Sequence, residues 1–272
     1  MTETSTTAIS LRDVTVRLGG RTILEDLDLE IPAGRVTAVM GPSGAGKTTV
    51  LRLATGQLKP DRGEVWIGDE RVDRLGGKAL GRLRRDIGVL LQNGALFTDL
   101  TSFDNVALPL REHSKLSEPL IRRLVLMKLE MVGLRGAADL YPAELSGGMK
   151  RRVATARAMA LDPKIVFYDE PFAGLDPISL GVSLRLIRDI NGALGTTSVV
   201  ITHDVREVAK LADHACIIAD HRIVATGTPD ELAASKDPLV RQFMQGEPDG
   251  PVPFHYPARG LEDEILAQGG MP

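Results

Sequence analysis

The chain has 272 residues, of which 43% are hydrophobic and 25% charged, so it is long enough for one large globular domain or two small ones. Its net charge of −3 and isoelectric point near 6.0 lack the basic excess of a dedicated nucleic-acid binder, and we expect no nucleic-acid partner. No apolar run approaches the roughly 18 residues of a membrane span and the N-terminus lacks a signal-peptide pattern, which predicts a cytosolic chain. The single cysteine, Cys216, lies in an apolar run and is expected to be a buried thiol.

Two strand patterns open the chain. Apolar residues from Ile9 to Val16 form the first, and Leu27, Leu29 and Ile31 alternate with charged residues in the second. A Pro-Ala-Gly turn then leads into the apolar run 36–40. This order predicts an antiparallel flap beside a parallel core.

A glycine-rich loop with the pattern G-x-x-x-x-G-K-[ST] follows this run and precedes a helical pattern. Its glycines lack Cβ atoms, so its N–H groups can turn toward phosphate oxygens, and the helix N-terminus adds partial positive charge. Lys47 can bridge the β- and γ-phosphates, and the Thr48 hydroxyl can ligate Mg²⁺. The alternative is a glycine-rich turn with a solvated lysine, which the flanking strand and helix disfavour. The predicted phosphate-binding residues are Gly41, Pro42, Ser43, Gly44, Ala45, Gly46, Lys47, Thr48 and Thr49.

A buried strand from Ile87 to Leu91 ends at Gln92, and the pattern is then helical from residue 93 to about residue 157. Within that region, apolar residues recur at near-helical spacing at Leu120, Leu124, Met127 and Met131. The alternation of strand and helix resumes with strands 165–168, 198–201 and 215–219 and helices 178–194 and 205–211. The predicted fold is α/β, with a helical subdomain inserted in a parallel core.

Ser146, Gly147 and Gly148 precede another helical pattern. A serine and two glycines at a helix start can form an anion-binding nest, because free N–H groups and the helix dipole point the same way. The alternative, which these residues alone favour, is a serine N-cap with permissive glycines. The basic cluster that follows, residues 150–152, is interpreted as a solvated helix face or a surface facing partner proteins.

Carboxylates stand at the end of strand 165–168. Asp169 is placed to hold Mg²⁺ beside the phosphate loop, and Glu170 to polarise an attacking water. The alternative is a solvated strand end, although adjacent carboxylates are costly without a nearby cation. His203 ends the next strand, at the edge where parallel sheets place ligands, which favours contact with the γ-phosphate over a structural role.

These motifs occur in the order typical of ABC transporter nucleotide-binding subunits, which the chain resembles from about Ile9 to Gly246. The resemblance implies a P-loop ABC ATPase that binds ATP and Mg²⁺ and forms a head-to-tail homodimer. It implies that Ser146 and Gly148 of one subunit close on the γ-phosphate held by the other and that Asp176 communicates across the dimer. It also implies that Gln92 senses Mg²⁺ and water, Glu170 is the general base and His203 holds the γ-phosphate.

A narrower resemblance, to the ATPases of Mla-type phospholipid transport systems, rests on residues 94–100, 105–113 and 250–257 and on Met149 of the signature motif. It implies a peripheral subunit on the cytoplasmic face of the bacterial inner membrane. Its expected partners are a membrane permease, a periplasmic MCE-type lipid-binding protein and a small STAS-domain protein. The expected cargo is phospholipid moving between the inner and outer membranes.

Two other functions are compatible with an ABC fold. A soluble ABC protein acting on nucleic acid or ribosomes usually carries two nucleotide domains or long coiled coils, for which this chain leaves no room. A transporter ATPase for a polar solute such as an amino acid remains open. One departure from the family concerns the base: Leu18 stands where many members have an aromatic that stacks on adenine, which weakens the prediction of adenine selectivity.

Two peripheral segments carry further expectations. Leu96 and Phe97 form either part of a groove for the permease or a satellite core, and the sequence favours neither. Residues 1–245 are expected to form the ATPase domain and residues 246–272 an extension that bridges the dimer. In that extension Val252, Phe254 and Tyr256 fall at every second position of a proline-rich, extended segment, and we expect them to be buried on the neighbouring subunit.

Overall fold

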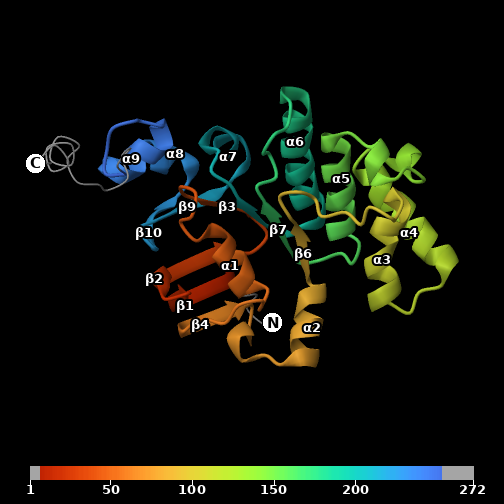
Figure 1. Ribbon diagram of the computed structural model, residues 1–272, viewed down its shortest axis with the longest axis horizontal. Helices are drawn as coiled ribbons and strands as arrows, with labels where there is room; N and C mark the ends of the chain where they lie inside the picture. The colour runs from red at the N-terminus through yellow and green to blue at the C-terminus, as the bar shows by residue number, and fades with distance from the viewer. Residues whose placement is uncertain (1–6, 253–272) are drawn as a thin grey trace, which may run out of the picture.

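The computed structural model describes residues 7–252, which form two sheets and a helical region (Figure 1). A four-stranded sheet has the order β2-β1-β4-β5 and a six-stranded sheet the order β10-β9-β3-β8-β7-β6. The first sheet contains β1 (Thr7–Leu18), β2 (Arg21–Pro32), β4 (Arg62–Ile67) and β5 (Glu70–Arg71). The second contains β3 (Val36–Met40), β6 (Ile87–Leu90), β7 (Ile165–Asp169), β8 (Thr197–Ile201), β9 (His214–Ala219) and β10 (Arg222–Gly227).

Helices join and cover these strands. They are α1 (Lys47–Ala54), α2 (Gly77–Arg85), α3 (Ser102–His113), α4 (Glu118–Met131), α5 (Gly147–Ala158), α6 (Pro177–Leu194), α7 (Val205–Leu211), α8 (Pro229–Ala233) and α9 (Pro238–Gln245). Within residues 7–252, no helix combines the length and apolar character needed to span a bilayer.

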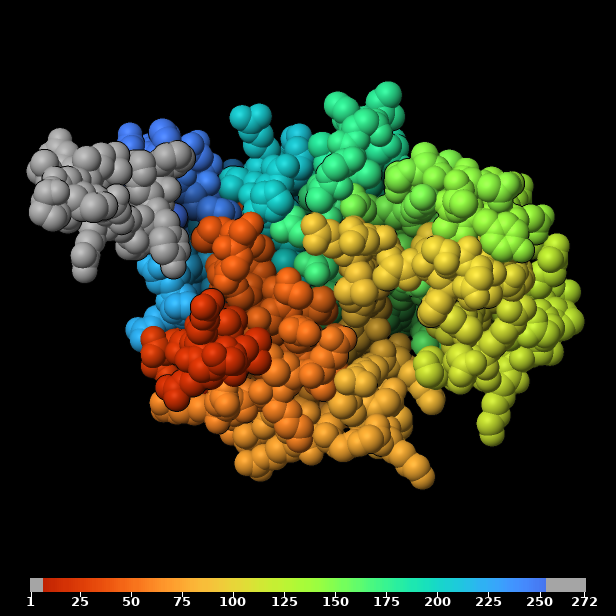
Figure 2. Space-filling view, viewed as in Figure 1, coloured from red at the N-terminus to blue at the C-terminus, as the bar shows by residue number. Residues whose placement is uncertain are grey.

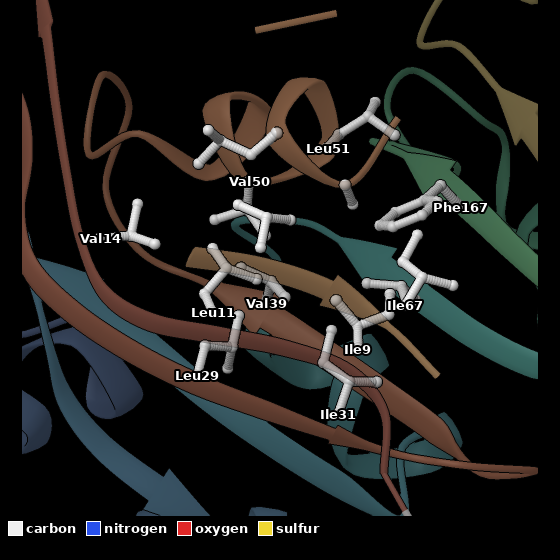
Figure 3. Packing of buried hydrophobic residues seen from close by; sticks show 14 of the residues in the cluster. Ile9, Leu11, Val14, Leu29, Ile31, Val39, Val50, Leu51, Ile67 and Phe167 are labelled. Atoms are coloured by element: carbon white, nitrogen blue, oxygen red, sulfur yellow. The ribbon is translucent and has the colours of Figure 1, made fainter. Parts of the chain in front are cut away.

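The antiparallel sheet and the parallel sheet share one core, which Figure 3 shows from close by. Ile9 and Leu11 of β1 are buried, and they pair in register with Ile31 and Leu29 of β2. The same cluster includes residues of α1 and the parallel sheet, among them Val50, Leu51, Val39 and Phe167. Along β2, burial of alternate residues from Leu27 to Ile31 is the cause of the charged and apolar alternation in its sequence.

The central strands of the parallel sheet are buried on both faces. Every residue of β3, β7 and β8 is buried, which explains their uninterrupted apolar and β-branched character. β3 pairs in parallel with β8 on one side and β9 on the other, and β7 pairs in parallel with β6 and β8. Only the edge strand β10 of this sheet is antiparallel, and the sequence analysis did not predict it.

Helices α3, α4 and α5 form a separate end of the molecule, the yellow to green part of Figures 1 and 2. Their apolar residues make a core of their own that includes Val106, Ile121, Val125 and Val153. The predicted helix is present as α4, and of the apolar residues at helical spacing Leu124 and Met131 are partly buried against this core. Ile121, Val125 and Leu129 are buried, whereas Met127 is 64% exposed. The α/β fold with an antiparallel subdomain and an inserted helical region is confirmed.

Candidate active site

Neighbouring strands bring the predicted site residues to one edge of the parallel sheet. The phosphate-loop residues follow β3 and His203 follows β8. Asp169 ends β7, Glu170 comes directly after it, and Gln92 follows β6. These strands lie next to one another in the order β3-β8-β7-β6. Because they are parallel, their carboxyl ends share one edge, and residues far apart in sequence are gathered there.

The loop between β3 and α1 has the shape that its glycines permit. Gly41, Gly44 and Gly46 have φ values of +148°, +82° and +99°. A Cβ on Gly41 would lie 2.2 Å from the carbonyl oxygen of Ile218, so only glycine fits there. Helix α1 begins at Lys47 with no side-chain cap, which leaves its first N–H groups available to a phosphate.

Lys47 is held inside the loop. Its Nζ donates to the carbonyl oxygen of Gly41 at 2.7 Å and to that of Pro42 at 3.0 Å. Burial lowers the pKa of Lys47, while the charges of Glu170 and Asp169 oppose that shift. The ammonium therefore lies in the field of both carboxylates, although its hydrogen bonds go to main-chain oxygens.

Asp169 is buried at the end of β7. Burial raises its pKa, the charge of Glu170 raises it further, and Lys47 lowers it. Such a carboxylate favours a cation in front of it. The other predicted metal ligands, the Thr48 hydroxyl and the Gln92 amide, also supply oxygen, which suits Mg²⁺. Residues 7–252 contain no cluster of three or more His, Cys, Asp or Glu side chains able to hold a metal, so phosphate oxygens would have to complete the shell.

Glu170 and His203 are hydrogen-bonded across adjacent strands. Oε1 of Glu170 lies 2.9 Å from Nδ1 of His203, and Oε2 accepts a hydrogen bond of 3.4 Å from the Thr202 hydroxyl. The backbone of Glu170 has a left-handed φ of +47°, and its N–H donates to the carbonyl oxygen of Ile201 at 2.8 Å. The predicted base, Glu170, and the predicted γ-phosphate contact, His203, are therefore directly hydrogen-bonded to each other.

The second nest lies on the helical region. Ser146 caps α5 by accepting a hydrogen bond from the N–H of Met149 at 3.2 Å, as in the N-cap alternative. Ser146 and Gly147 are exposed, and a Cβ on Gly148 would lie 2.9 Å from Oγ of Ser179. These residues belong to α5 rather than to the sheet edge that gathers the others.

Asp176 is the N-cap of α6. Its carboxylate accepts hydrogen bonds from the N–H groups of Ile178 at 3.0 Å and Ser179 at 3.1 Å. Hydrogen bonds from Ser179 keep the pKa of the Asp176 carboxyl below its ordinary value. The residue is exposed, so it can face another molecule while capping its own helix.

The interpretation of residues 150–152 as a solvated face or a surface for partner proteins is wrong for Arg151 and Arg152. Arg151 donates to the carbonyl oxygens of Pro171, Ala173 and Gln92, each at 2.9 Å, and Arg152 donates to that of Val132 at 3.0 Å. Burial lowers the pKa of Arg151. The sequence held a signal for this, because Arg151 stands three and four residues before the buried Ala154 and Thr155, on the same helix face.

Arg157, on the same helix, was also missed. It donates to the carbonyl oxygens of Gly94 and Ala95, each at 2.7 Å, and its guanidinium lies 5.8 Å from the ring centroid of Phe97. Asn105 fixes the same segment by bonding the main chain of Phe97, Leu100 and Thr101. Phe97 is 49% exposed, whereas Leu96 packs against two core clusters.

The expectation about Cys216 is confirmed. Cys216 is fully buried, and burial raises the pKa of its thiol to about 12, as expected of an inert core cysteine. Leu18 is 38% exposed at the end of β1.

Comparisons with known proteins agree with this geometry. A family model described as ABC transporter matches residues 24–173. The MlaF proteins of Haemophilus influenzae and Escherichia coli K12, each named an intermembrane phospholipid transport system ATP-binding protein, are 53% identical over 258 residues, which is 95% of this chain and 98% and 96% of theirs. A probable ribonucleotide transport ATP-binding protein, mkl of Mycobacterium leprae, is 40% identical over 90% of this chain and 71% of its own length.

Solved structures give the same result. A dimeric ATP-binding cassette, MJ0796, bound to ADP and Pi in a post-hydrolysis state, has a TM-score of 0.74 and 32% identity over 81% of this chain and 98% of its own. CbiO1 of Clostridium perfringens, part of an ABC transporter complex, has a TM-score of 0.79 and 29% identity over 85% of this chain and 92% of its own. With its phosphate loop, strand-end carboxylates and signature helix in one fold, the chain belongs to the ABC transporter family as an ATPase subunit.

Proposed function

We propose that this chain is the ATP-hydrolysing subunit of an Mla-type system that moves phospholipid between the inner and outer membranes. The observation that carries the proposal is the 53% identity to MlaF proteins over 95% of the chain. A match of this extent includes the regions outside the common ABC motifs, where a transporter's ATPase meets its own partners.

In the proposed reaction Glu170 accepts a proton from the attacking water, and His203 holds the γ-phosphate oxygens and orients the Glu170 carboxylate. Asp169, Thr48 and Gln92 would hold Mg²⁺, which neutralises charge on the phosphates. Lys47 would exchange its bonds to Gly41 and Pro42 for phosphate oxygens. The supporting geometry is the buried Asp169 beside Lys47 and the hydrogen bond between Glu170 and His203.

The proposal includes a head-to-tail homodimer. Ser146, Gly147 and Asp176 are exposed, which leaves them free to meet the phosphate loop of a second copy. In that arrangement the nest on α5 of one subunit, with Gly148, completes the nucleotide site of the other, which gives a reason for two nests in one chain. The related cassette MJ0796 is itself a dimer in its structure.

The proposed partners are a membrane permease, an MCE-type periplasmic lipid-binding protein and a small STAS-domain protein, with this chain at the cytoplasmic face of the bacterial inner membrane. Phe97 supports the contact with the permease. Asn105 and Arg157 hold its segment, yet half of its ring remains exposed, directly after the Gln92 region. An exposed aromatic on a held loop is suited to insertion into a partner.

A polar cargo is the second candidate, and the 40% identity to the probable ribonucleotide transport protein of Mycobacterium leprae favours it. Purification of the native complex in mild detergent through a tag on this chain separates the two. We expect an MCE protein and copurifying phospholipid, measured by mass spectrometry, together with stimulation of ATP turnover by phospholipid. A soluble solute-binding protein in place of the MCE protein, with stimulation by its solute, would refute the lipid assignment.

A further inference from the structure

We propose that Arg151 is a positioning residue for ATP hydrolysis. Its side chain links the signature helix α5 both to the segment that carries Gln92 and to the loop that follows Glu170. A displacement of α5 is then passed to both segments through one guanidinium. The inference rests on the ATPase chemistry above and not on the identity of the cargo.

The contacts join three parts of the chain that are distant in sequence. Nη1 of Arg151 donates to the carbonyl oxygens of Pro171 and Ala173, and Nη2 donates to that of Gln92, all at 2.9 Å. Arg151 itself stands on α5, three residues after Gly148. The helix that begins with the signature glycines is therefore hydrogen-bonded to the segments that follow both β6 and β7.

These attachments lie next to the chemistry. Pro171 directly follows Glu170, and the N–H of Ala173 points to the carbonyl oxygen of Glu170 at 3.4 Å, which closes a turn. Strand β8 holds the other side of Glu170, through the N–H bond to Ile201. Glu170 is thus held between β8 and a loop anchored on α5, and a small shift of that loop moves the carboxylate relative to its water.

The chemical form of the side chain matters. A guanidinium is a planar fork with five donors and no acceptor, so it can serve several carbonyl oxygens in a fixed geometry. The described hydrogen bonds of Arg151 all go to main-chain carbonyls, which move only with their segments. A lysine ammonium at this position keeps the charge but is a point donor on a flexible stem, and it cannot hold both segments in one orientation.

Arg152 provides a matched control on the same helix. It is also partly buried, and its bond to Val132 stays within the helical region. Removal of its guanidinium therefore weakens a similar contact without touching either the Gln92 segment or the loop after Glu170. We compare Arg151→Met, Arg151→Lys and Arg152→Met in the complete transporter complex and in the isolated chain.

For Arg151→Met we expect kcat to fall by roughly tenfold to a hundredfold, with the KM for ATP within about twofold of the original, because the phosphate loop makes none of these contacts. Arg151→Lys should show a similar separation of kcat from KM. Arg152→Met should keep its kcat. Amide exchange in Arg151→Met should rise in segments 92–95 and 171–175 and stay unchanged in segment 41–49.

Several results would overturn the proposal. An unchanged kcat in Arg151→Met would do so, as would equal losses in Arg151→Met and Arg152→Met. If Arg151→Met fails to fold, Arg151→Lys becomes the test of the proposal. Normal ATP turnover in Arg151→Lys would show that a positive charge suffices and that the planar guanidinium does not position the two segments. Loss of copurifying phospholipid would count against the transport assignment and leave this test intact, because the readout is ATP turnover.

Discussion

The carboxylate of Glu170 and the imidazole of His203 lie 2.9 Å apart, Oε1 to Nδ1. The Thr202 hydroxyl donates a longer and weaker hydrogen bond, of 3.4 Å, to the other carboxylate oxygen of Glu170, Oε2. Nδ1 must carry a proton to donate to Glu170, and Nε2 can contact a phosphate oxygen only as a second N–H donor. A water that approaches the base competes more easily with the longer contact. This geometry predicts that Oε2 is the oxygen that accepts the proton.

The first prediction concerns the base. Glu170→Gln preserves the size of the side chain but cannot accept a proton, so ATP binding should persist while turnover falls by roughly 10²–10⁴-fold. The dimer trapped with ATP should become more populated. Turnover and equilibrium nucleotide binding are the measurements, and Glu130→Gln, at an exposed position on the helical region, is the control. Near-normal hydrolysis by Glu170→Gln would show that another group is the base.

The second prediction concerns coupling to the permease. Phe97→Asp places a charge on a half-exposed ring position, so the chain should fold and bind ATP but lose stimulation by the permease. Leu96→Asp is the matched control, because Leu96 packs against two core clusters and its replacement should lower thermal stability. ATP turnover with and without the permease tests both. Unfolding of Phe97→Asp would instead assign Phe97 to the core of the helical region.

The third prediction concerns the C-terminal extension. Phe254 and Tyr256 lie outside the residues that the structure describes. Just before them, Gln242 bonds both main-chain groups of Val252, Nε2 to the carbonyl oxygen at 2.9 Å and Oε1 to the N–H at 2.8 Å. Val252 itself is 42% exposed in the single chain, and its burial on a neighbouring subunit stays a prediction.

We expect truncation after Gln245 to leave a folded chain that binds ATP but dimerises less. Phe254→Ala combined with Tyr256→Ala should reproduce most of the loss, since burial of each is worth about 1.5–3 kcal/mol. Truncation after Val252 keeps the Gln242 contacts and should be equally defective. Sedimentation with and without ATP measures the effect, and unchanged dimerisation would exclude a bridging role.

The fourth prediction concerns stability and pH. The pKa of Asp169 is raised by burial and by Glu170, so without nucleotide its ionised form destabilises the fold near neutral pH. This cost declines as the pH falls through the raised pKa. Asp169→Asn should therefore abolish ATP turnover but raise Tm at neutral pH by about 2–4 °C, with a smaller gain in acid. Asp139→Asn, at an exposed position, should change neither, and a lowered Tm for Asp169→Asn would contradict the argument.

The sheet-edge site was predictable because its determinants are local. Each determinant can be recognised within a few residues of sequence: a β-branched run, a glycine pattern or a carboxylate at a strand end. The parallel pairing of the strands then brings them to one edge of the sheet. Helix α7 (Val205–Leu211) was predicted to the residue for the same reason. The apolar face of α4 was not, because apolar residues surround that helix and periodicity alone cannot choose among them.

Other features depend on partners that are distant in sequence. The spacing of Arg151 from buried residues of α5 indicates its helix face, but its carbonyl partners in Gln92, Pro171 and Ala173 come from distant segments that no local pattern identifies. Strand β10 is an edge strand with no fully buried residue, so its sequence lacks the apolar alternation that reveals β1 and β2.

The position of β3 in its sheet has a consequence for synthesis of the chain. The strand that carries the phosphate loop pairs only with β8 and β9 among the described strands, and both lie more than 150 residues later. During translation β3 and its loop therefore emerge with neither neighbour present, while β1 and β2 can already form their hairpin. The ATP site is assembled late, after β8 and β9 have left the ribosome, and a chain that stops before β8 leaves both edges of β3 open to aggregation.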